Sequence, residues 1–253
     1  AAGDTSLTAV GVVYAPTTTN ANPQLRGTSV TNLTSSAATG VMALSATGLT
    51  AGTGYSYAAY ATNRVGTTYA TVSAITTSWP LPTLAFATPS TATVVYGATL
   101  SNAATSSLSG GSYGAISYTS SATSIATVNA TTGVITPVAV GTTTITATQA
   151  VAAGFNDTGS QTYVLTVGQA SQTITFGTLA NKAFGAAPFA VAATASSSLT
   201  PTYSIVSGPA TLSGSTVTLT GSGTVIVRAS QAGNGNYTAA TPVDQSFTVS
   251  TTV

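Results

Sequence analysis

The chain has 253 residues, too many for one small domain and enough for two or three. Only 3% of them are charged and the net charge is +1, which excludes the basic patch of a nucleic-acid-binding protein or of a protein held on an anionic membrane. Because histidine and cysteine are absent, Ser–His and Cys–His catalysis, histidine-ligated metals and iron–sulfur clusters are excluded as well.

The first 80 residues alternate apolar with small polar residues in short runs, which is the pattern of half-buried strands. Threonine is frequent because its branched side chain suits a pleated surface. Five strands are predicted in this segment, at 7–14, 25–33, 40–47, 55–62 and 68–76. No stretch of the chain has the apolar period and caps of a helix. The apolar run 183–195 is broken by Gly185 and Pro188, so a membrane-spanning helix is not expected either.

A stiff junction follows the first segment. Trp79 precedes Pro80 and Pro82, and proline restricts the linker. A lone tryptophan here is open to two interpretations, a sugar-stacking side chain or a residue wedged at a hinge between domains, and the hinge is favoured. A second and shorter junction is predicted at 168–170.

An internal repeat occupies the rest of the chain, with its two copies starting at Thr83 and Thr173 and lying about 80 to 90 residues apart. The matches are Phe86 with Phe176, Tyr96-Gly97 with Phe184-Gly185, Tyr118 with Tyr203, 144–150 with 225–232, Phe155 with Tyr237, and 165–167 with 247–249. Matched aromatic residues are expected to fill the same core positions in two similar sandwiches. The residues predicted to be largely buried are Tyr55, Phe86, Tyr118, Ile145, Phe176, Tyr203 and Val225.

Three resemblances to known families rest on these stretches. IATVNATTGVITPVAVGTTTITAT, from Ile125, resembles the bacterial immunoglobulin-like repeats of intimin- and invasin-type adhesins. The segment from Gln172 is similar along its whole length to a repeat of giant multi-repeat bacterial surface proteins. The residues Leu49, Gly52, Thr53 and Tyr55 resemble the corner before the sixth strand of a fibronectin type III domain. That resemblance makes Tyr55 the corner tyrosine, whose hydroxyl bonds a nearby backbone group.

The resemblances imply an all-β chain of tandem immunoglobulin-like and fibronectin type III-like sandwiches. The expected domains are a fibronectin type III-like sandwich at 1–80 and bacterial immunoglobulin-like sandwiches at 81–168 and 169–253. The two opening strands of the fibronectin type III family have no counterpart in the first domain. Two explanations remain open: the chain is an excerpt of a longer array, or another subunit supplies what is missing.

No catalytic, cofactor-binding or metal site is predicted. The stretches 156–158 and 234–236 are interpreted as turns, because one acid per repeat is too few for calcium, which takes about six to eight oxygens. Asp157 and Asp244 belong to different repeats, so a glycosidase-type pair of carboxylates is not expected. Lys182 beside Asn181 has the residue types of a pilin isopeptide bond, but a solvated lysine is favoured.

These features predict a non-enzymatic extracellular structural repeat protein without cofactors, a subunit of a bacterial surface fibre or filament. The alternative is an adhesin whose loops bind carbohydrate or a partner protein. Edge strands are normally protected by charged residues, and four basic and three acidic residues protect few edges. The expected partners are therefore copies of the chain or adjacent repeats, head to tail and including strand donation, with no nucleic acid and no membrane insertion. The interface candidates are Leu7, Val10, Val12, Tyr14, Trp79, Phe247 and Val249.

Overall fold

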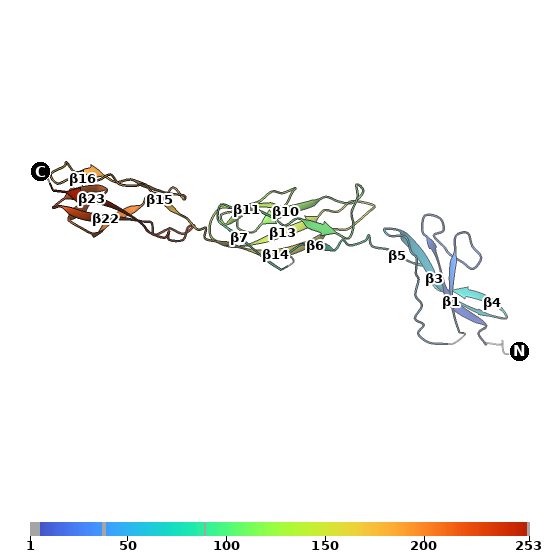
Figure 1. Cartoon of the computed structure of the whole chain (residues 1–253). Helices are drawn as coiled ribbons and strands as arrows, with labels where there is room; N and C mark the ends of the chain where they lie inside the picture. Colours follow the sequence, from blue (N-terminus) through green and yellow to red (C-terminus); the bar gives the residue numbers. More distant parts are fainter. Residues whose placement is uncertain (1–5, 37–38, 89, 252–253) are drawn as a thin grey trace. The chain divides into compact units, whose positions relative to one another are not determined.

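The computed structural model describes residues 6–36, 39–88 and 90–251, and every regular element in these ranges is a β-strand (Figure 1). The predicted all-β fold is therefore confirmed. No helix of the described ranges is long and apolar enough to cross a membrane. By residue contacts the chain divides into two compact units. The first comprises Ala1–Thr83, Ser106–Ala115 and Gln149–Gly159, and the second comprises Leu84–Thr105, Ile116–Thr148 and Ser160–Val253.

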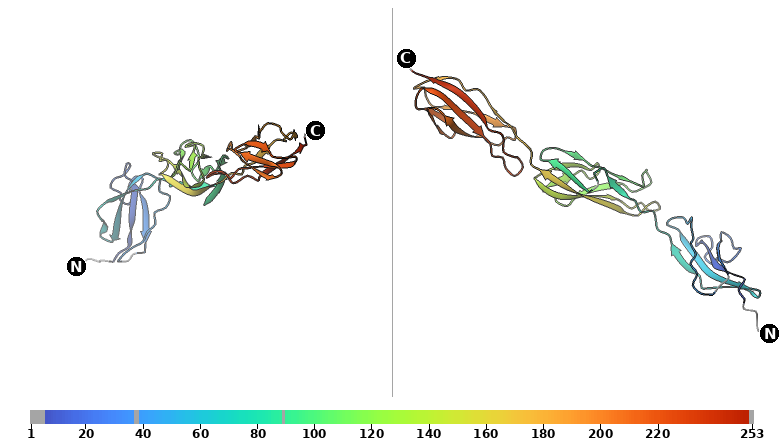
Figure 2. Two further views of the ribbon diagram at one scale, coloured as in Figure 1. Left: turned by 90° about the vertical axis from the view of Figure 1, so that its left-hand side faces the viewer. Right: turned by 60° about the horizontal axis from the view of Figure 1, so that its bottom comes forward.

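The first segment, residues 1–80, forms a single five-stranded sheet in the order β2-β1-β3-β4, with β5 also pairing with β3. The strands are β1 (Ala9–Pro16), β2 (Thr31–Ser35), β3 (Gly54–Asn63), β4 (Gly66–Tyr69) and β5 (Ser73–Thr76). Figure 2 shows these strands, in blue and cyan, side by side in one layer. The pairs β1–β2, β1–β3, β3–β4 and β3–β5 are all antiparallel.

Three predicted strands of this segment are corrected. The strand expected at 68–76 is divided into β4 and β5, which pair with different parts of β3. The strand expected at 25–33 begins only at Thr31, because residues 17–30 fold into turns in which Arg26 and Ser29 have φ angles of 65° and 60°. The strand expected at 40–47 is absent. A strand needs a neighbour to supply its hydrogen bonds, and no described strand pairs with this stretch. Residues 37 and 38, which precede it, lie outside the described ranges.

The second segment contains a four-stranded sheet in the order β10-β13-β14-β7, a three-stranded sheet β11-β12-β8 and the pair β6-β9. Its strands are β6 (Leu84–Phe86), β7 (Thr91–Val95), β8 (Leu100–Ser101), β9 (Ala104–Ser106), β10 (Ile116–Ser120), β11 (Ala126–Val128), β12 (Val134–Pro137), β13 (Gly141–Gln149) and β14 (Gly159–Gly168). One pair, β7 with β14, is parallel.

The third segment repeats this arrangement strand for strand. Its sheets are β19-β22-β23-β16, β20-β21-β17 and β15-β18, and here β16 pairs with β23 in parallel. Its strands are β15 (Ile174–Phe176), β16 (Lys182–Ala183), β17 (Phe189–Ala190), β18 (Ala193–Ala195), β19 (Thr202–Ser207), β20 (Ala210–Ser213), β21 (Thr216–Leu219), β22 (Gly223–Ser230) and β23 (Val243–Ser250). The equal sheet orders confirm the internal repeat.

The core predictions hold for six of the seven residues: Tyr55, Phe86, Tyr118, Ile145, Phe176 and Val225 are buried. Tyr203 is half-buried and packs against the core of the third segment. The matched tyrosines also share a polar role that sequence reasoning did not predict. The hydroxyl of Tyr118 accepts the N–H of Ala104, and the hydroxyl of Tyr203 accepts the N–H of Ala193. The two repeats therefore preserve a hydrogen bond as well as a ring position.

Candidate strand-accepting site

The sheet of the first segment has two faces of different character. Successive residues of a strand point to opposite faces, and the register of β1 with β3 places Val10, Val12 and Tyr14 opposite Ala61, Ala59 and Tyr57. We call this side the open face. Its further members are Leu33 of β2, Tyr55 of β3 and Ile75 of β5. The other side, called the covered face, carries Val13, Ala58 and Tyr60.

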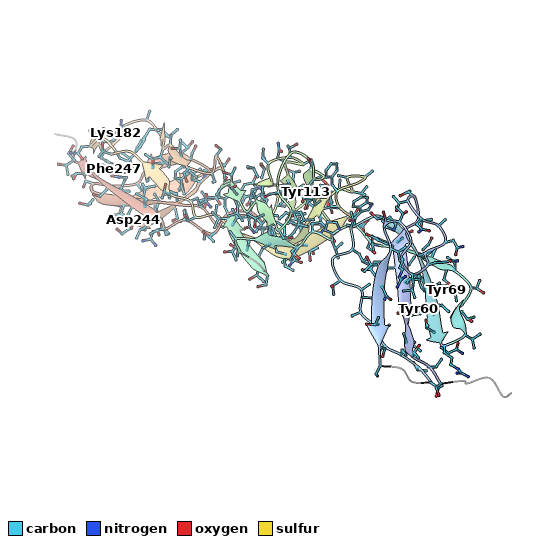
Figure 3. The ribbon with its side chains drawn as sticks, turned by 90° about the vertical axis from the view of Figure 1, so that its right-hand side faces the viewer. Tyr60, Tyr69, Tyr113, Lys182, Asp244 and Phe247 are labelled. Atoms are coloured by element: carbon cyan, nitrogen blue, oxygen red, sulfur yellow. The ribbon has the colours of Figure 1, made fainter. Side chains whose placement is uncertain are left out.

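The covered face is closed by the turns of residues 17–30. Leu25 and Val30 from these turns pack against Val13, Ala58 and Tyr60. Tyr60 and Tyr69 lie together on β3 and β4 with ring centroids 6.2 Å apart (Figure 3). The Tyr69 hydroxyl accepts the N–H of Leu25 at 2.9 Å. This face has its own small core and needs no further partner.

The open face is covered only in part, by the segment 41–47. Met42, Leu44 and Ala46 alternate along it and line hollows of the open face, while Val41 is fully exposed. The stretch thus keeps the side-chain alternation of a strand. Its backbone makes no hydrogen bond with another described residue. An extended backbone with unsatisfied donors and acceptors is a template for an added strand.

Two hollows lie beside this segment: the second is on the open face, and the first also takes in Tyr60 and Tyr69 of the covered face. The first has a volume of about 390 Å³ and is lined by Leu7, Val10, Met42, Ala59, Tyr60, Ala61, Thr68, Tyr69 and Ala70. The second has a volume of about 310 Å³ and is lined by Val12, Tyr14, Leu33, Leu44, Ala46, Leu49, Tyr55, Tyr57 and Ile75. Neither lining contains a charged residue. Each hollow is therefore suited to apolar side chains.

The interface candidates fall into three places. Leu7, Val10, Val12 and Tyr14 come together on the open face, where Val10 is buried and lines the first hollow only at its floor. Trp79 lies outside both hollows. Phe247 and Val249 are buried in the core of the third segment, so an incoming chain has no access to them and they take no further part in the proposed interface. Sequence reasoning missed Met42, Leu44, Leu33, Tyr57 and Ile75, although their alternation was the available signal.

The corner tyrosine implied by the fibronectin type III resemblance is confirmed. The hydroxyl of Tyr55 accepts the N–H of Thr50 at 3.0 Å. The side chain is buried, and its ring meets that of Tyr14 edge to face with centroids 6.0 Å apart. This bond ties the turn before β3 to the strand, and Leu49 of that turn lines the second hollow.

Trp79 packs on a glycine of the same turn. Gly52 has a φ of 61°, and a Cβ added there would overlap the Trp79 ring. We expect Gly52→Ala to displace the indole ring into water, because an overlap with a rigid ring cannot be absorbed without movement. The measurement is tryptophan fluorescence, which should shift to the red; Trp79 is the chain's single tryptophan.

Gly48→Ala is the matched control for this change. Gly48 has a similar φ of 71°, but a Cβ added there meets nothing within 4 Å. It carries the same backbone strain, of the order of 1 kcal/mol, without the clash. Equal red shifts in the two variants would contradict the assigned contact.

Three charged side chains of the third segment have an assigned contact within the described ranges. Arg228 donates two hydrogen bonds of 2.8 Å to Asp244, which lower the pKa of that carboxyl; the pair is exposed and of little weight for stability. Lys182 Nζ lies 5.0 Å from the ring centroid of Phe189. Asn156 is buried, and its side chain bonds Gly114, Ala150 and Asp157. Among the described residues no three acids, histidines or cysteines gather as metal ligands would.

The chain's sequence matches one family model. Residues 87–158 match the bacterial Ig-like domain, group 2, and the stretch from Ile125 that carried the resemblance lies within this match. The match therefore covers most of the second segment, and the third segment shares its sheet order without a family match of its own. No curated protein matches the sequence of the chain.

Several solved structures align with this chain at low identity and low TM-score. Drosophila N-cadherin EC1-4 is 13% identical with a TM-score of 0.32, and the alignment covers 79% of this chain and 57% of that one. The I-band fragment I67-I69 of titin is 12% identical with a TM-score of 0.35, with 96% and 88% covered. Mouse cadherin-23 EC22-24 is 14% identical with a TM-score of 0.31, with 96% and 86% covered. The chain thus spans little more than half of the N-cadherin structure.

Proposed function

We propose that this chain is a non-enzymatic extracellular structural repeat protein, a subunit of a surface fibre, whose first segment is completed by an extended strand of a second copy. The observation that carries the proposal is the open face, where the unpaired stretch 41–47 runs between two apolar hollows. Strand addition requires this combination, since main-chain bonds give affinity and pockets for alternate side chains give specificity.

The occupant we propose is a segment of the chain itself. A charged side chain would lose its hydration in hollows whose lining offers no opposite charge. With four basic and three acidic residues in 253, most segments of a second copy enter without that penalty. A net charge of +1 also leaves little repulsion between copies. The contact is expected at the end formed by residues 1–14, of which 1–5 lie outside the described residues.

The domain organisation proposed with this function is three domains, at 1–80, 81–168 and 169–253, of which the first is an incomplete sandwich with a single sheet. Its support is the division of the buried apolar residues into three clusters, whose buried members span 13–60, 84–167 and 174–249. In repeat arrays each domain contacts mainly its neighbours. The open face gives the first of these domains an association surface that the two repeats, with their complete sheets, do not need.

The test compares Leu44→Lys with Ser45→Lys in the full chain. Leu44 lines the second hollow, whereas its neighbour Ser45 is exposed. A lysine buried at position 44 should cost about 2 kcal/mol or more, which lowers the association constant by about 30-fold. Sedimentation velocity at rising concentration should show growing species for the parent chain and for Ser45→Lys, and a persistent monomer for Leu44→Lys.

The same experiment includes a control for folding and an outcome that would contradict the proposal. Unchanged Trp79 fluorescence in Leu44→Lys shows that the first segment is still folded. A parent chain that stays a monodisperse monomer at high concentration would overturn the fibre proposal. If such a monomer bound a glycan or a partner protein, the adhesin alternative would replace it.

A further inference from the structure

Within the second compact unit, a turn of the third segment packs against two residues of the second segment, Tyr96 and Val140. The turn, residues 233–238, is here called the tip turn. The side chain of Asn234 closes it by accepting the N–H groups of Asn236 and Tyr237 at 2.8 and 3.0 Å. Its backbone is tied to the junction residue Ala170, whose N–H bonds Asn236 and whose carbonyl accepts the N–H of Thr238. These hydrogen bonds fix the tip turn beside Ala170, where the chain enters the third segment.

The corner that receives the tip turn is formed by Tyr96 and Val140. The ring of Tyr237 meets the ring of Tyr96 edge to face, with centroids 5.4 Å apart and an interplanar angle of 81°. The N–H of Val140 donates to Oδ1 of Asn236 at 3.1 Å. An aromatic pair of this geometry contributes beyond its buried area, and the hydrogen bond adds direction. We call the pair Tyr96 and Val140 the socket.

The third segment carries the same corner. The N–H of Tyr96 bonds the carbonyl of Gly168 at 2.9 Å, and the N–H of Phe184 bonds the carbonyl of Ser250 at 2.9 Å. Each aromatic residue follows the strand of a parallel pair, β7 with β14 and β16 with β23. Each precedes a glycine of positive φ, 79° at Gly97 and 92° at Gly185. The second and third segments thus share an aromatic residue, a following glycine turn and a parallel strand pair at equivalent positions.

The backbone donor of the socket is repeated too. Val140 stands directly before Gly141, which opens β13 with a φ of 151°, and Ser222 stands directly before Gly223, which opens β22 with a φ of 140°. Ser222 is exposed and Phe184 is 41% exposed. Figure 1 shows β16 at the same end of the third segment as the C terminus.

We propose that Phe184 and the N–H of Ser222 form a second socket, which binds the tip turn of a further repeat of the same kind. The partner is recognised by its chemistry: an asparagine followed by an aromatic residue, held in a rigid turn at the start of an immunoglobulin-like sandwich. The asparagine oxygen accepts the N–H of Ser222, and the aromatic ring packs edge to face on Phe184. This inference deepens the proposed repeat array but does not depend on the open face.

The test extends the chain with its own repeat. Because Ser250 is the counterpart of Gly168, residues 169–253 are joined a second time directly after Ser250, so that the spacing of the resident junction is reproduced. Amide hydrogen exchange followed by NMR should slow at Ser222 by at least about tenfold relative to the original chain. Asn236→Ala in the added repeat alone should abolish this protection, and Phe184→Ala should weaken it.

The resident junction supplies the positive control. Val140 should exchange slowly in the original chain, and Asn236→Ala there should accelerate its exchange by a similar factor. Protection of the Tyr237 amide in the added repeat, which bonds Asn234 of its own turn, shows that this repeat is folded. Ser222 exchanging at the same rate in the extended and original chains, with Val140 and the added Tyr237 protected, would overturn the proposal.

Failure of this proposal is distinguishable from failure of the strand-accepting site. Leu44→Lys placed in the extended chain should stop self-association and leave the protection of Ser222 intact. Self-association without protection of Ser222 would retain the fibre proposal and remove the second socket.

Discussion

Phe176→Ala is expected to unfold the third segment while leaving the first segment intact. Phe176 is buried in the core of the third segment, and its ring lies 5.9 Å from that of Tyr203. Truncating a buried phenylalanine costs about 3 to 5 kcal/mol, a large share of the roughly 5 to 15 kcal/mol of a whole domain. Calorimetry should show one transition lost or lowered by many degrees, while Trp79 fluorescence keeps its original midpoint.

In Phe176→Ala the second segment should be affected less than the third segment and more than the first. Unfolding the third segment removes the tip turn from its socket, so Val140 should lose amide protection while buried residues such as Leu165 keep theirs. Phe184→Ala, at a position 41% exposed in the same segment, is the matched control and should change stability far less. If all three segments melted together in Phe176→Ala, the independent cores proposed for them would be refuted.

Tyr60→Ala is the corresponding change in the first segment, and we expect it to unfold that segment alone. Tyr60 is buried on the covered face, its ring packs against Tyr69, and it also covers Gly11, where an added Cβ would lie 2.9 Å from the ring. The loss should be about 3 kcal/mol or more, as for other large aromatic truncations. A single sheet with a small core has little stability to lose, so Trp79 fluorescence should report the unfolded state at ambient temperature.

Tyr57→Ala is the matched control, because Tyr57 lies on the same strand, β3, but is 39% exposed on the open face. It should lower the stability of the isolated chain only slightly. If Tyr57→Ala unfolded the first segment as readily as Tyr60→Ala, the assignment of the small core to the covered face would be wrong. In assembled chains Tyr57→Ala should instead weaken association, since Tyr57 lines the second hollow.

The sequence by itself determined the fold class and the repeat. Alternation of apolar and small polar residues is a local property of the sequence. It predicts a strand wherever successive side chains point alternately to the core and to solvent. The equivalence of Phe86 with Phe176 and of Tyr118 with Tyr203 was readable because a repeated fold needs large side chains at the same core positions. The lack of histidine and cysteine likewise excluded catalysis and metal binding by these two residue types.

Only the tertiary structure decided which alternating stretches pair. The run 40–47 has the same alternation as β1, yet it is not a strand, because pairing depends on a neighbour far away in the sequence. Phe247 and Val249 are likewise interface candidates by sequence, as part of a C-terminal strand. In the structure that strand pairs with β22, and the two side chains pack in the core of the third segment. The joint between Asn236 and Val140 spans 96 positions of the chain, a separation at which composition and periodicity carry no information about contact.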